Sequence, residues 1–194
     1  MAARRFSQAI SEGDGISVLV EVYDVESARA AEAQRAEAIV IRTAVDGIRD
    51  ATELPLLWRG AGPPDAAVRA GADACLLVVA DHEDGGELEA LQAEAFELGL
   101  DCVVEVRNED ELELALERLD PEIFLLSRSE DDEEDALGRA LELLPDVPAG
   151  KLAVADVPSS TRQQVDELER AGVDAVIVGA RDVAELVGQA PPQV

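Results

Sequence analysis

The sequence predicts a single compact (βα)8 barrel, an α/β fold. Eight short apolar runs recur along the 194 residues, each followed by a polar segment with helical spacing, which indicates βα units and a parallel sheet. Most runs are near-continuous Val, Leu and Ile, as in strands covered on both faces. An open doubly wound sheet is built from the same units, but no glycine-rich phosphate fingerprint follows the first run. We therefore expect a closed TIM-barrel architecture.

Each apolar run marks one expected strand. In chain order the strands are Ile16–Val22, Ala38–Arg42, Leu54–Trp58, Ala74–Val79, Cys102–Val106, Ile123–Ser127, Leu152–Ala155 and Ala175–Val178. Barrels of this kind typically have about 250 residues, so the loops here must be short.

The polar segments between the runs supply the helices. The clearest are Glu87–Leu98, Glu109–Leu119, Asp132–Leu144 and Arg162–Ala171, and an Ala-rich helix is expected within Asp24–Ala36. Gly99 and Gly172 follow two of them, where helices stop. No linker rich in Gly, Ser or Pro divides the chain. We expect one domain over 1–194, with loosely ordered ends at 1–12 and 188–194.

Charge excludes two classes of partner. Forty-three Asp and Glu face sixteen Lys and Arg, for a net charge of −27, which would repel phosphate backbones and anionic lipid surfaces. We therefore expect no nucleic-acid and no membrane partner. Adaptation to salt and GC-rich coding would each explain the acidity. Lys151 is the only lysine, so chemistry that needs a titratable ammonium group has a single candidate.

The two cysteines point to a reducing compartment. Cys75 and Cys102 lie within apolar runs, and no secretory leader or apolar run of about 18 residues is apparent. We expect reduced, buried thiols in a cytoplasmic protein. Each cysteine is one residue off the register of the strand positions that share a face with Glu105. This predicts that both cysteine side chains face the helices.

Functional residues of such barrels lie at the carboxyl ends of the strands. Glu21 and Glu105 are there, each within an apolar run, where an unpaired carboxylate would cost several kcal/mol on burial. They are either structural ion-pair partners of Arg42, Arg59 or Arg107, or they bind a ligand.

Asp156 ends the seventh run and is either a turn or helix-capping residue or a catalytic carboxylate. Gly179 and Ala180 end the eighth run, where backbone amides can hold a phosphate, and Ser159 and Ser160 could add hydroxyl donors. A plain strand-to-helix turn is the alternative for this region.

The order of several segments carries a family resemblance. ISVLVEV, LPLL, AGADACLLVV, LGLDCVVEV, ELELAL, LAVAD and AGVDAVIVGA together resemble the indole-3-glycerol-phosphate synthase family over about residues 6 to 187. The most specific part is GADACLLVV followed by LGLDCVVEVRNEDELELAL. The resemblance implies a barrel enzyme that decarboxylates and dehydrates an open-chain, phosphorylated arylamino sugar to close an indole ring. It implies no metal and no organic cofactor.

The resemblance also implies roles for individual residues. Glu21 and Glu105 match the family's first-strand and fifth-strand glutamates. Asp156 falls at the seventh-strand glutamate, and Arg128 matches a sixth-strand arginine. The family's sixth-strand asparagine falls near Leu126.

Both catalytic lysines of the family are replaced. The first-strand lysine falls on Tyr23, and the third-strand lysine falls on Arg59. Because the pKa of arginine lies above about 12, Arg59 cannot readily give up a proton at neutral pH. The family's long loop after the first strand is shortened as well.

Three hypotheses about function follow. The first is a shortened and divergent family member with little or no synthase activity. The second is an active carbon–carbon lyase that uses Glu21, Arg59, Glu105 and Asp156 on a phosphorylated small molecule. The third is a non-catalytic binding or assembly subunit. The sequence leaves the oligomeric state open.

Overall fold

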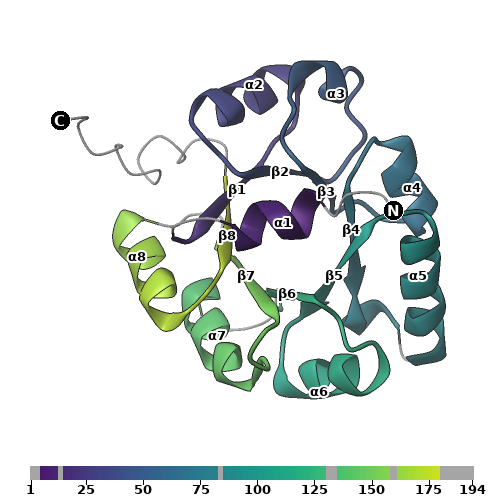
Figure 1. The fold of residues 1–194 in the computed structure, drawn as a ribbon. Coiled ribbons are helices and arrows are strands. Elements are labelled where there is room, and N and C mark those ends of the chain that lie inside the picture. Colours follow the sequence, from purple (N-terminus) through teal and green to yellow (C-terminus); the bar gives the residue numbers. More distant parts are fainter. Residues whose placement is uncertain (1–4, 13–14, 83–84, 130–134, 158–160, 180–194) are drawn as a thin grey trace.

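Eight parallel strands close into a barrel in chain order, β1 to β8, inside a layer of helices (Figure 1). The structure is a computed structural model that describes residues 5–12, 15–82, 85–129, 135–157 and 161–179. Each strand pairs in parallel with the next, and β8 pairs with β1. The predicted single compact (βα)8 barrel is confirmed.

The strands lie close to their predicted positions. They are β1 Ser17–Glu21, β2 Ala38–Ile41, β3 Leu56–Trp58, β4 Ala74–Val78, β5 Asp101–Val106, β6 Ile123–Leu126, β7 Leu152–Asp156 and β8 Ala175–Gly179. The α-helices are α1 Arg5–Ser11, α2 Val25–Ala33, α3 Ile48–Ala51, α4 Pro64–Arg69, α5 Gly85–Glu97, α6 Glu109–Arg118, α7 Ala136–Leu143 and α8 Arg162–Ala171. Two 3₁₀ turns, η1 Val79–Asp81 and η2 Leu144–Asp146, follow β4 and α7.

Alternate residues of each strand enter two separate cores, because successive side chains of a strand point to opposite faces. Leu19, Leu57, Val103 and Val154 belong to the core inside the barrel. Their neighbours along the strands belong to a larger core between the strands and the helices. Both faces are therefore buried, which explains why the strands appear as continuous apolar runs.

Helix α1 lies across the barrel in Figure 1 and seals its amino-terminal end. Phe6 and Ile10 are buried in the inner core, and the backbone N–H of Ser7 donates to Oδ2 of Asp101 at 2.9 Å. We expected a loosely ordered end over 1–12, whereas residues 5–11 of that segment form this helix. The expected loose end at 188–194 lies outside the described residues.

Carboxylates just before three strands hold the amino-terminal end of the sheet. Glu37 accepts the N–H of Val18 at 2.8 Å. Asp73 of AGADA accepts the N–H of Leu56 at 2.9 Å, and Asp174 of AGVDA accepts that of Ala153 at 2.8 Å. Each of these N–H groups belongs to the strand beside the one that the carboxylate precedes. Each contact therefore fixes the register between those two strands.

Local signals account for the helix ends. Asn108, Asp135 and Thr161 cap α6, α7 and α8 through their side-chain oxygens. Gly172 ends α8 with φ +101°, a backbone conformation that favours glycine. Helix α7 was expected to begin at Asp132, which lies outside the described residues. The short helices α3 and α4 were not predicted, because one or two turns are too short to show a period.

Candidate functional site

The charged residues predicted at the strand ends meet at one end of the barrel, called here the mouth. Glu21, Arg59, Glu105 and Asp156 each lie two positions beyond a residue of the inner core, so the strand period turns each of them inward. All four residues therefore lie on the inward face and at the carboxyl ends of the strands, as predicted.

Arg59 is the central residue of the mouth. Its side chain is only 7% exposed, and its Nη2 lies 2.5 Å from Oδ2 of Asp156 and 3.7 Å from Oε2 of Glu105. Strands β3 and β7 are opposite each other in the closed ring, so the contact between Arg59 and Asp156 spans the mouth. Nη1 of Arg59 is buried and has no hydrogen-bond partner among the described residues.

Glu105 is held on both of its oxygens. Its Oε1 accepts from Oγ of Ser127 at 2.7 Å and from Nε of Arg107 at 3.2 Å, while Oε2 faces Arg59. Ser127 is not among the predicted site residues. Its position could have been predicted to face inward, because Ser127 lies two positions beyond the inward-facing Leu125.

Glu21 forms a second ion pair at the mouth. Its carboxylate accepts from Nε and Nη2 of Arg42 at 2.8 and 3.3 Å. This contact raises the pKa of Arg42 above its ordinary value, and the charges of Asp156 and Glu105 act in the same direction. Glu21 and Glu105 are thus both paired with arginines, as expected if they are structural ion-pair partners. Such pairing is compatible with a binding role, because half of the Arg42 side chain remains exposed.

Six charged side chains form the described ion-pair network at the mouth. Three carboxylates, those of Glu21, Glu105 and Asp156, face three guanidinium groups. The guanidinium groups belong to Arg42, Arg59 and Arg107. This network is therefore balanced in charge, although the chain carries −27.

The remaining predicted residues lie around this network. Asp156 is not the cap of the next helix, because Thr161 caps α8. Gly179 ends β8 in register with Glu21 of β1. Arg128 is exposed beyond β6 and donates from Nη1 to the carbonyl oxygen of Ser129 at 3.3 Å. These positions leave Arg128 and Gly179 on the mouth side of the barrel.

Three predicted phosphate-binding residues cannot be placed. Ser159, Ser160 and Ala180 lie outside the described residues. Their roles stay predictions. Tyr23, at the position of the family's first-strand lysine, follows β1 and is 66% exposed.

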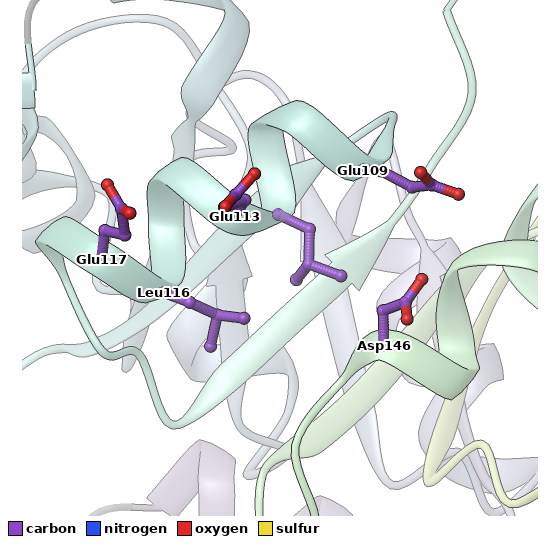
Figure 2. Close-up of a pocket in the computed structure, with 6 residues that line it drawn as sticks. Glu109, Glu113, Leu116, Glu117 and Asp146 are labelled. Carbon is purple, nitrogen blue, oxygen red and sulfur yellow. The ribbon is translucent and has the colours of Figure 1, made fainter.

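A separate groove lies in the helix layer (Figure 2). It has a volume of about 450 Å³ and is lined by α6 and η2, with Glu109, Glu113 and Glu117 along one side and Asp146 on the other. Every charged residue in this lining is acidic. The groove is therefore unsuited to an anionic ligand.

The described residues contain neither a metal-binding cluster nor a membrane-spanning helix. No group of three or more His, Cys, Asp or Glu side chains among them is arranged to hold a metal ion. None of the helices described here has the length and apolar character needed to cross a membrane.

Comparison with known sequences points to one family. The family model described as indole-3-glycerol phosphate synthase matches residues 65–185. A protein of that name from Alkaliphilus metalliredigens (strain QYMF) is 30% identical over 205 residues, covering 91% of this chain and 78% of that protein. A second, from Polaromonas sp. (strain JS666 / ATCC BAA-500), is 40% identical over 109 residues. That match covers 56% of this chain and only 41% of the relative.

Solved structures support the fold alone. An N-acetylmannosamine-6-phosphate 2-epimerase from Clostridium perfringens matches with a TM-score of 0.69 at 14% identity, covering 87% of each chain. An oxaloacetate acetylhydrolase matches with a TM-score of 0.66 at 17% identity, covering 92% of this chain and 80% of the other. Identities this low carry no information about activity.

The family assignment therefore depends on sequence and agrees with the closed barrel. The matched region runs from α4 past the end of β8, and the Alkaliphilus relative extends the match over most of the chain. The chain belongs to the indole-3-glycerol phosphate synthase family.

Proposed function

We propose that this protein is a divergent family member that binds a phosphorylated small molecule and has little or no synthase activity. The observation that carries the proposal is the setting of Arg59, which stands where the resemblance implies a lysine. Its guanidinium lies 2.5 Å from Asp156 and 3.7 Å from Glu105. Arginine side chains stay charged at neutral pH, so a residue of this type is unsuited to donate the proton of a dehydration.

The remaining lysine cannot take over this role. Lys151 precedes β7, at the end of the barrel opposite the mouth, and its Nζ pairs with Oδ1 of Asp120 at 2.6 Å. Exposed Tyr23 replaces the other lysine of the family. The mouth therefore has no ammonium group among the described residues to supply a proton.

Ligand binding is retained in this proposal. The described ion-pair network at the mouth is balanced in charge, and Arg42 and Arg107 keep part of their surface exposed, where they could contact an anion. We place the phosphate near Gly179 and Ala180, with Ser159, Ser160 and Arg128 as further donors. No metal or organic cofactor is part of the proposal.

Complementation tests the loss of synthase activity. A tryptophan auxotroph that lacks the synthase would carry this gene or, as the matched control, the gene of the Alkaliphilus relative. We expect growth with the relative only. Growth at the normal rate with this gene would overturn the inactive assignment.

Thermal shift tests ligand binding independently. Sugar phosphates and anthranilate derivatives would be screened, because a ligand that binds only the folded state raises the unfolding temperature. We expect at least one phosphorylated compound to raise it, and an Arg128→Gln variant to show a smaller shift. Failure of every phosphate to stabilise the protein would contradict the binding proposal.

An active lyase is the second candidate. It is favoured by the convergence of Glu21, Arg59, Glu105 and Asp156 in one mouth. In this case Glu105 would transfer the proton and Arg59 would hold the negative charge of the substrate. Turnover by the purified protein that disappears in Glu105→Gln, without loss of stability, would support this candidate.

A further inference from the structure

Cys75 and Cys102 lie side by side beneath the helix layer. They are direct partners in the register of β4 and β5, and both belong to the core between strands and helices. Their exposed fractions are 2% and 5%, and both are free thiols. Helix α5, which connects the two strands, packs against both of them. The proposed function uses neither cysteine.

The register brings the two thiols within bonding reach. Neighbouring strands lie about 4.8 Å apart, inside the range of roughly 4.4 to 6.8 Å that a disulfide requires between its Cα atoms. Both side chains point to the same face of the sheet. Directly paired parallel positions hold their Cβ atoms close to the strand spacing, which is wide for a disulfide. A disulfide here would therefore be strained and easily reduced.

The two thiols affect each other. Contact with Cys75 and burial raise the pKa of the Cys102 thiol. Because the two cysteines are direct register partners, whichever sulfur is oxidised first has the other beside it to resolve it.

We propose that Cys75 and Cys102 form a reversible disulfide on exposure to a small peroxide. The sulfur of one of the two cysteines attacks hydrogen peroxide, breaking the O–O bond and giving a sulfenic acid and one water. The sulfur of the other cysteine then forms the S–S bond as the sulfenic oxygen leaves as a second water. Two thiols are oxidised and one peroxide is reduced. The bond would tie β4 to β5 beneath α5.

The test treats the folded full-length protein with hydrogen peroxide and measures its intact mass and its thiol content after denaturation. We expect a monomer lighter by two hydrogen atoms, loss of both thiols, and, after cleavage at the glutamates between the two cysteines, a linked pair of peptides that separates on reduction. Reduced glutathione should restore the original mass. Adducts that add oxygen to each cysteine separately, or a disulfide-linked dimer, would overturn the proposal.

Two controls test separately whether the two thiols lie close enough to bond and whether a reagent can reach them. Cys75→Ser and Cys102→Ser variants should never lose two hydrogens as monomers under the same treatment. Alkylation of the folded protein by iodoacetamide measures how often the helix layer opens. Thiols that alkylate but form no disulfide would show that the pairing is unproductive. Thiols that neither alkylate nor oxidise would equally overturn the native-state disulfide.

Discussion

Nη2 of Arg59 on β3 lies 2.5 Å from Oδ2 of Asp156 on β7, so an ion pair joins opposite strands across the mouth of the barrel. From the sequence, Arg59 is one of three possible arginine partners of Glu105, and Asp156 is not among the residues expected to pair with Arg59. The contact between Arg59 and Glu105 is present at 3.7 Å, but Asp156 is the nearer partner. Glu105 instead forms its shortest contact with Ser127. The distances assign Arg59 chiefly to Asp156.

Removal of Arg59 should destabilise the protein. Arg59→Ala leaves the carboxylates of Asp156 and Glu105 buried without their shared cation, at a cost of about 1 to 4 kcal/mol. Adding Asp156→Asn should recover more of this loss than adding Glu105→Gln, because Glu105 keeps Arg107 and Ser127 as partners. Urea unfolding of the single and double variants measures the coupling.

A matched control is available on the surface. Arg69 pairs with Asp65 on exposed α4, and Arg69→Ala should change the unfolding free energy by less than about 1 kcal/mol. Equal losses for Arg59→Ala and Arg69→Ala would contradict a buried bridge across the mouth.

Restoring the family's lysines should reveal whether they limit activity. In Arg59→Lys with Tyr23→Lys, two titratable ammonium groups return to the mouth, and we expect synthase activity to appear where the unmodified protein has none. Indole formation from the family's substrate is the measurement, with Tyr23→Lys alone as the control. If the unmodified protein is active and Arg59→Ala abolishes turnover without loss of stability, Arg59 is a working residue.

Ser127 should contribute to stability through Glu105. Ser127→Ala removes a buried hydroxyl that donates to Oε1 of Glu105 at 2.7 Å, and a lost hydrogen bond to a charged group costs about 1 to 3 kcal/mol. Chemical unfolding of this variant, beside Ser11→Ala at an exposed helix end, measures the difference. A Ser127→Ala variant as stable as Ser11→Ala would show that Glu105 does not need this donor.

Glu37 should make stability depend on pH. Burial raises the pKa of its carboxyl above the ordinary value of 4.5, so the folded state holds the proton more tightly than the unfolded chain. The resulting stabilisation is present below pH 4.5 and is lost as the pH rises through the raised pKa. At neutral pH the ionised, partly buried carboxylate is unfavourable.

Glu37→Gln should therefore be more stable than the unmodified protein at pH 7, with the difference vanishing in acid. The side-chain oxygen of the new glutamine can still accept the N–H of Val18, which Glu37 accepts at 2.8 Å. Glu37→Ala loses that acceptor and should be less stable than Glu37→Gln at every pH. Thermal unfolding between pH 4 and 8 measures the stability of the unmodified protein, Glu37→Gln and Glu37→Ala, and so checks both comparisons. A stability advantage of Glu37→Gln that grew in acid would contradict the raised pKa.

The sequence by itself determined the βα repeat and the inward direction of the charged strand ends. Continuous apolar runs reveal the strands, and two-residue spacing from Leu19, Leu57, Val103 and Val154 assigns the face of each following charged residue. The family could be recognised as well, because the order of short motifs survives where individual catalytic residues do not.

Tertiary structure decided which charges pair. Strand period gives the face of a residue but not its distance from a residue on a distant strand. That distance follows from closure, which places β3 opposite β7 and lets Arg59 reach Asp156. Helix α1 depended on the tertiary structure in the same way, since a short helix is stable only once the barrel end buries Phe6 and Ile10.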